Sequence, residues 1–369
     1  MTDALMHRLE LVPRWAWSLG GGLLVAALVV GFAYGQRLAE VNDGHLRAAT
    51  LFHETRKATL EDYIASAAFN IIAVSQKPDL AEELLYLTYA TRAGAEQGGI
   101  ERIREVSRAR QRLRGWMAKV VELFDFRDAM LISAEGTVVY ATVEETIQGR
   151  DLMGTLHRDS ALSEAYQRAV RYQSRIVVAD LPETFPTDGS LFIVAALAIR
   201  DQDGKLSGVM AVKLDVRKVA KMLQADAADT GLIDAYLLDR DGRLLTRSRP
   251  WLSEPPLGVY LETPAAQQAN MWFTGEMQDT EGLFGEQVQV VYGPVRSGTL
   301  QLSLMTEGPL VETLSPDQLI WELYFAALAG FFTFGLLHAF MPRTSDSDRS
   351  RRAQFRAALR GEDSADYQI

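Results

Sequence analysis

A lysine in an otherwise apolar segment is the residue of this sequence best suited to bind a ligand. Lys213 stands in the run GVMAVKLDV, residues 208–216, which alternates with the period of a β-strand. Alternation places it on one face with Val209 and Ala211. An ammonium group held there could bind a carboxylate through a charge-assisted hydrogen bond. In the alternative, the aliphatic stem covers apolar surface and the amine reaches water at the strand end.

Three further residues of the same region are candidates for the same ligand site. Tyr140 ends one predicted strand, Asp180 ends another, and Phe192 begins the hairpin that leads to Lys213. The segment 181–189, LPETFPTDG, contains two prolines and could cover the site as a lid. As alternatives, both aromatic residues fill a core and Asp180 caps a turn.

The sequence offers little for catalysis or for metal binding. It has no cysteine, and it contains none of the G-x-S-x-G, phosphate-loop and H-E-x-x-H motifs. Its 5 histidines are scattered, and only His45 and His53 share a predicted helix. RDQDG and DRDGR lack the first acidic position and the final glutamate of a calcium loop, so we interpret them as turns. We therefore expect no enzyme activity, no cofactor and no metal site.

Helices and strands predicted from periodicity must position the candidate residues. Residues 36–76, 79–93 and 100–124 carry apolar residues at helical spacing. From residue 128 the period changes to two, and short strands, glycine turns and one short helix follow. The pattern predicts an α+β protein with a helical stalk and PAS-like antiparallel sheets.

The strand-rich part also repeats itself. The segment LISAEGTVVYA, residues 131–141, aligns without gaps on LLDRDGRLLTR, residues 237–247. Internal similarity of this kind is typical of a duplicated unit. We therefore expect two tandem modules, each with a sheet of its own.

Two uncharged segments predict membrane-spanning helices. No charged residue occurs between Arg14 and Arg37, or between Glu322 and Arg343, and each stretch has about the 20 residues needed to cross a hydrocarbon core. As an alternative, the first segment is a cleaved signal peptide, although its apolar stretch is longer than usual for one. Arginines after the second segment predict a cytoplasmic tail. Both termini are then cytoplasmic, and residues 37–320 are periplasmic.

Five segments, in this order, resemble a double Cache sensor domain, the extracytoplasmic part of many bacterial chemoreceptors, sensor kinases and cyclases. They are LEDYIASAAFNIIAVSQKPDLAEEL, DAMLISAEGTVVYAT, FIVAALAIRDQDGKLSGVMAVKLDV, ADTGLIDAYLLDRDGRLL and VQVVYGPV, within residues 36–315. The resemblance implies that one sheet face packs on the long helices and the other forms the floor of a ligand pocket. In amino-acid-binding members an aspartate stands at the position that resembles Lys213, and their Arg-x-Trp element has no counterpart here. The lysine therefore favours an anionic ligand.

The resemblance and the two apolar segments together predict the organisation of the chain. We expect a short cytoplasmic N-terminus (1–14), a transmembrane helix (15–36), a helical stalk (37–127), a membrane-distal Cache module (128–225), a membrane-proximal Cache module (226–315), a second transmembrane helix (320–342) and a cytoplasmic Arg-rich tail (343–369). The HAMP linker and output domain of such receptors are not expected after Pro342.

These features predict a sensor rather than an enzyme. We expect a protein of the bacterial inner membrane that binds a small anionic ligand, forms a homodimer through its stalk and signals through a separate cytoplasmic or membrane protein. The alternative is a structural or assembly subunit of an envelope complex that uses the Cache fold as a protein-docking platform. A net charge of −10 without a basic stripe argues against nucleic acid as a partner.

Overall fold

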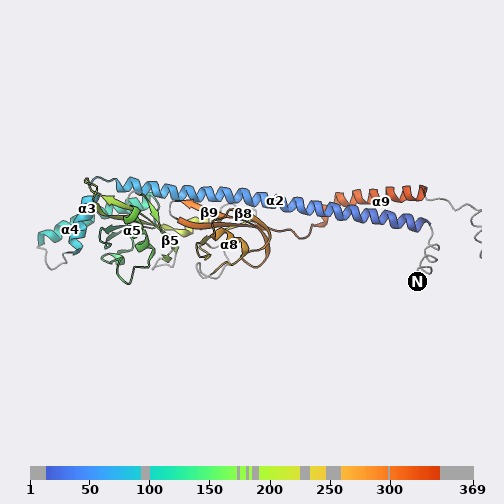
Figure 1. Cartoon of the computed structure of the whole chain (residues 1–369). Helices are drawn as coiled ribbons and strands as arrows, with labels where there is room; N and C mark the ends of the chain where they lie inside the picture. The colour runs from blue at the N-terminus through green and yellow to red at the C-terminus, as the bar shows by residue number, and fades with distance from the viewer. Residues whose placement is uncertain are drawn as a thin grey trace, which may run out of the picture. The chain divides into compact units, whose positions relative to one another are not determined.

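The chain folds into two compact units that share its first long helix. A computed structural model describes residues 14–92, 100–172, 175–179, 183–184, 191–224, 233–246, 259–297 and 300–340. One unit consists of Met1–Val41 and Val311–Ile369, and the other of Asn42–Leu310. Figure 1 shows the chain, with labels on α2, α3, α4, α5, α8, α9, β5, β8 and β9.

The unit that holds both ends of the chain pairs two apolar helices. They are the first part of α2, Arg14–Ser75, and α9, Ile320–Phe340, which follows the short helix η2, Pro316–Leu319. Both are long and apolar enough to cross a membrane. A Cβ atom added to Gly22 would lie 2.7 Å from the carbonyl oxygen of Gly330, so the two backbones touch where side chains are absent. Small residues allow the same close approach between helices in membranes.

Helices form one wall of the larger unit. The remainder of α2 is followed by α3, Leu80–Arg92, and α4, Ile100–Leu123. On α2 the buried residues recur at helical spacing, as Leu60, Ile64 and Ile71 show, and they share one apolar core with residues of both sheets. The prediction of three helices in this region is confirmed. Apolar residues at this spacing lie on one face only when the segment is helical.

The first sheet is antiparallel and lies between these helices and α5. Its order is β2-β1-β6-β5-β3, with β4 paired to β5. Val209 and Ala211 of β6 pack with α5, whereas Met210 and Val212 belong to the core that includes the stalk. The elements are β1 Asp128–Ser133, β2 Val138–Ala141, η1 Glu145–Ile147, α5 Ala161–Tyr172, β3 Val177–Val178, β4 Glu183–Thr184, β5 Leu191–Arg200 and β6 Leu206–Asp215.

The second sheet has an apolar core of its own. Its order is β7-β10-β9-β8, again antiparallel, and it pairs with no strand of the first sheet among the described residues. Helix α8 packs on the face that carries Tyr236 and Met305. The expectation of two modules with separate sheets is confirmed. The elements are α6 Val216–Gln224, which follows the first sheet, β7 Asp234–Asp239, α8 Pro264–Asn270, β8 Gly275–Glu281, β9 Gln287–Ser297 and β10 Leu300–Pro309.

The turns after β1 and β7 share one geometry. Gly136 and Gly242 both have a positive φ, 94° and 85°, which only glycine adopts without strain. The Oγ atom of Ser133 and the Oδ1 atom of Asp239 each accept hydrogen bonds from the backbone N–H groups two and four residues later. The turns within the two aligned segments therefore match in structure, and DRDGR is the turn it was predicted to be.

Candidate ligand-binding site

Lys213 is buried on the α5 side of the first sheet. Its exposed fraction is 3%, and its Nζ atom lies 4.1 Å from the ring centre of Phe192 on the neighbouring strand β5. At this distance the ammonium group and the aromatic face attract each other. The alternative in which the amine reaches water at the strand end is wrong.

Glu144 provides the counter-charge for this lysine. The Nζ atom of Lys213 donates a hydrogen bond to Oε2 of Glu144 at 2.5 Å, and both side chains are largely buried. Glu144 lies between β2 and η1, in a loop whose sequence lacks the alternation of a strand. Contact between opposite charges offsets part of the cost of removing each from water. An apolar strand can therefore hold a lysine here because a loop distant in sequence supplies a carboxylate.

Asp128 fixes that loop in place. It lies opposite Lys213 in the pairing of β1 with β6 and is completely buried. Its Oδ1 atom accepts the N–H groups of Thr142 and Val143, and its Oδ2 atom accepts the N–H of Glu144 at 3.0 Å. Burial raises the pKa of Asp128, whereas these hydrogen bonds and the charge of Lys213 oppose the rise. One buried carboxylate thus orients the loop that presents the other.

A cavity of about 470 Å³ lies against Lys213 and Phe192. Cavities of roughly 300–1,000 Å³ are typical of small-molecule sites. The cavity is lined by two cationic side chains, Lys213 and Arg150, by the imidazole of His157 and by one carboxylate, Glu144. An anionic group of a ligand could therefore accept hydrogen bonds from several side chains, and only Glu144 would compete with it. The lining residues are Glu144, Thr146, Ile147, Arg150, Leu156, His157, Ser160, Leu162, Phe192 and Lys213.

The structure brings together two of the four residues selected from the sequence. Phe192 and Lys213 line the cavity, whereas Tyr140 packs in the core on the stalk side and is not among the lining residues. The physical reason is a bulge: the pairing of β2 with β1 shifts beside Tyr140, so strict alternation of faces does not hold there. Asp180 lies outside the described residues, as does the predicted lid 181–189 except for Glu183 and Thr184.

Sequence reasoning missed the other wall of the cavity. Glu144, Arg150 and His157 come from the stretch between β2 and α5, which has neither helical nor strand periodicity. The only local signal is the acidic pair Glu144–Glu145 directly after a predicted strand, and such pairs are common on solvated loops. Which of the two carboxylates turns inward depends on Asp128.

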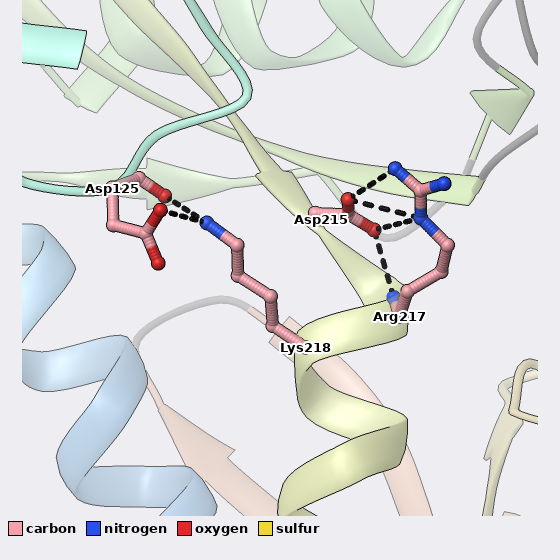
Figure 2. A network of polar contacts seen from close by, with 4 residues as sticks. All are labelled: Asp125, Asp215, Arg217 and Lys218. Atoms are coloured by element: carbon pink, nitrogen blue, oxygen red, sulfur yellow. Dashed lines mark hydrogen bonds and ion pairs between the residues drawn. The ribbon is translucent and has the colours of Figure 1, made fainter. Parts of the chain in front are cut away.

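A second polar network stands where β6 ends, and it is structural. Asp215 accepts the backbone N–H of Arg217, which caps the start of α6, and pairs with its guanidinium at 2.7 Å (Figure 2). Burial favours a higher pKa for Asp215, but the hydrogen bonds from Arg217 outweigh it and lower the pKa. Lys218 donates to the carbonyl oxygen of Asp125 at 2.6 Å and pairs with its carboxylate. These contacts anchor α6, and none of the four residues is among those that line the cavity beside Lys213.

A larger hollow, about 760 Å³, lies between α3 and α4. Lys77 at its edge pairs with Glu83 at 2.8 Å and lies 5.4 Å from the ring centre of Trp116. Its lining mixes three cations with three carboxylates: Lys77, Asp79, Glu82, Glu83, Tyr86, Arg108, Ala109, Arg112 and Trp116. This hollow lies among helices rather than over a sheet, so it is a weaker candidate than the cavity beside Lys213.

No protein-family model matches the sequence, and no curated protein matches it. Solved structures do resemble the fold at low sequence identity. An extracellular ligand-binding receptor from Desulfohalobium retbaense matches 71% of this chain with 12% identity and a TM-score of 0.49, and this chain spans 40% of that receptor. The isoleucine-bound sensory domain of the Campylobacter jejuni chemoreceptor Tlp3 matches 73% with 14% identity and a TM-score of 0.47, over 95% of its length.

The sensor domain of the V. cholerae histidine kinase DctB is matched over 99% of its length. It covers 73% of this chain with 14% identity and a TM-score of 0.50. This chain has a long helix and two tandem antiparallel sheets, the arrangement that the five sequence segments predicted. The chain therefore has the fold of a double Cache sensor domain.

Proposed function

We propose that this protein is a membrane-anchored sensor that binds a small anionic ligand in the cavity beside Lys213 and signals to a separate protein. The observation that carries the proposal is a buried lysine at the floor of a ligand-sized cavity in the first module. Two apolar helices in the other unit support anchoring in a membrane. With the arginine-rich tail in the cytoplasm, residues 37–320 lie in the periplasm and both termini inside.

The ligand enters by competing with Glu144. An anionic group that binds Lys213 takes the place of the Glu144 carboxylate, while Arg150 and His157 line the same cavity. The loop between β2 and η1 then has two arrangements, one paired to the lysine and one displaced. A ligand shifts such an equilibrium only through its different affinity for the two states, and this exchange of partners supplies that difference.

The stalk provides the frame for a homodimer. On the part of α2 that belongs to the larger unit, Leu51 and Phe69 are exposed by 71% and 70%, although both are apolar. An apolar face that a monomer leaves in water favours association. Because the chain has no cysteine, a single Phe69→Cys substitution tests this contact by disulfide crosslinking between two copies in membranes. A cysteine at the solvated position Glu54 of the same helix is the control.

A thermal-shift screen of the full chain in detergent tests the ligand site. The panel contains organic acids, amino acids and polyamines, and we expect stabilisation by an organic acid but not by a polyamine. Lys213→Ala should abolish that stabilisation, because the anion loses its charged donor in a buried site. Lys205→Ala, on the exposed turn of the same hairpin, is the matched control and should keep it. Stabilisation that survives Lys213→Ala would place the ligand elsewhere, for which the hollow between α3 and α4 is the next site to test.

A docking platform is the second candidate function. The observation that favours it is that Glu144 already neutralises Lys213 without a ligand. In that case the ion pair is a structural element of the sheet, and no member of the panel shifts the unfolding temperature. Copurification of a stoichiometric envelope protein that is lost on disrupting the loop around Glu144 would then support docking.

A further inference from the structure

The second module carries a carboxyl group where the first carries its ammonium group. Lys213 of β6 lies opposite Asp128, the first residue of β1. In the second sheet Glu307 of β10 lies opposite Asp234, the first residue of β7. The two positions are therefore equivalent in strand pairing and opposite in charge.

Glu307 is buried, with an exposed fraction of 3%. Its Oε1 atom accepts a hydrogen bond from the hydroxyl of Tyr236 at 2.5 Å and another from the N–H of Leu283 at 2.9 Å. Its Oε2 atom is also buried and has no hydrogen-bond partner within the described part of the chain. Leu283 stands in the turn that joins β8 to β9, so Glu307 ties this hairpin to the centre of the sheet.

Two acidic groups act on Glu307. Asp234 on β7 and Glu286 in the β8–β9 turn both disfavour a second negative charge. Tyr236 is a further titratable neighbour, and its own pKa is raised by burial and by Glu307. Lys213 has Glu144 beside it, whereas no cation forms an ion pair with Glu307 in the ranges that the structure covers. A buried carboxylate without a cation is costly, so the group takes up a proton instead.

The pKa of Glu307 agrees with this geometry. Burial raises the pKa of Glu307 to about 7, the hydrogen bonds from Tyr236 and Leu283 limit the rise, and Asp234 and Glu286 add to it. The ordinary value for this side chain is 4.5. The carboxyl group therefore changes its charge within the range of pH that an extracytoplasmic domain meets.

We propose that Glu307 is a proton-binding site of the second module and that the bound proton holds the β8–β9 hairpin closed. The proton resides on Oε2, since Oε1 already accepts two donors. When it leaves, the unpaired negative charge is stabilised best by water, which can reach it only if the turn around Leu283 opens. The module thus responds to pH independently of any ligand beside Lys213.

Hydrogen exchange of residues 281–287, measured by mass spectrometry on the full chain in detergent, tests the proposal. The closed hairpin binds the proton more tightly than the open one, so protection is greatest below about pH 4.5, falls by up to about tenfold per pH unit as pH rises to about 7, and is constant above that. Rates are corrected for the intrinsic pH dependence of exchange. Glu307→Gln, which cannot ionise, should give protection independent of pH over this range. Glu281→Gln, an exposed glutamate of the same hairpin, should behave as the wild type.

Two neighbouring substitutions make the test independent of how well Glu307→Gln folds. Tyr236→Phe removes a donor that favours the ionised form, so the upper end of the transition should move to higher pH. Glu286→Gln removes a negative charge and should move it to lower pH. A wild-type profile without a transition, a profile unchanged by Glu307→Gln, or shifts that do not have these opposite signs would overturn the proposal.

Discussion

The carboxylate of Asp128 accepts the backbone N–H of Glu144 at 3.0 Å, while the side chain of Glu144 pairs with Lys213 at 2.5 Å. Asp128 and Lys213 face each other on adjacent strands, so the loop after β2 is fastened to the sheet at two points. The floor and the wall of the cavity are thereby one hydrogen-bonded assembly. A substitution of Asp128, Glu144 or Lys213 should therefore alter the contacts of the other two residues.

Asp128→Ala should release the loop. Four backbone N–H groups, those of Ala129, Thr142, Val143 and Glu144, lose a hydrogen bond to this carboxylate. We expect the free energy of unfolding to fall by on the order of 2–4 kcal/mol. Hydrogen exchange of residues 142–150 should accelerate more than that of the rest of the sheet. The matched control is Asp201→Ala, which removes a similar acceptor from the exposed turn of the β5–β6 hairpin and should cost about 1 kcal/mol or less. Equal effects of the two substitutions would contradict the role assigned to Asp128.

Lys213→Ala should destabilise the first module without any ligand present. It leaves the carboxylates of Glu144 and Asp128 buried without the cation between them, which typically costs about 3–5 kcal/mol. Lys213→Glu should be worse, since it adds a third negative charge. Combining Lys213→Ala with Glu144→Gln should recover part of the loss, because one buried charge disappears with its partner. Denaturant unfolding of the four proteins gives the coupling energy, and additive effects would show that the ion pair is energetically unimportant.

His53 should make the contact between α2 and the second sheet sensitive to acid. Its side chain is completely buried, and its Nδ1 atom lies 3.1 Å from Oγ1 of Thr306. Burial, with a smaller effect from the charge of Lys57, lowers the pKa of His53 from 6.5 to about 4. A lowered pKa contributes stability that is complete above about pH 6.5 and is lost as pH falls through 4, up to about 3 kcal/mol in total.

His53→Gln should remove this dependence. We expect hydrogen exchange of β10 to speed up in acid in the wild type and not in the variant, with His45→Gln on the same helix as the control. The effect runs opposite to that of Glu307 over nearly the same range of pH. The two effects are therefore measured in different segments, β10 for His53 and residues 281–287 for Glu307.

Gly22→Leu should separate the two apolar helices. A side chain at this position meets the carbonyl oxygen of Gly330, and neither backbone can move aside without parting the pair. Because the chain has no cysteine, a cysteine introduced at Ala326, which is 1% exposed, reports the contact through its rate of reaction with a membrane-permeant maleimide. We expect at least a tenfold faster reaction in Gly22→Leu. Gly20→Leu, where an added Cβ meets nothing within 4 Å, should leave the rate unchanged.

Local pattern determined much of this fold. The spacing of Leu60, Ile64 and Ile71 predicted a helix with one buried stripe, and the alternation around Lys213 predicted the face on which this lysine lies. The turn glycines Gly136 and Gly242 marked the duplicated modules. Periodicity and turn chemistry are properties of neighbouring residues, so a sequence displays them before anything folds.

Only the tertiary structure determined which residues contact the buried charges. Glu144 is 69 residues from Lys213 in the chain, and nothing in the loop around it indicates which carboxylate turns inward. A single bulge beside Tyr140 placed that residue on the stalk side, and the equivalence of Lys213 with Glu307 follows from strand pairing rather than from similarity of sequence. The partner of a buried charge is selected by packing between distant segments, and no local preference encodes it.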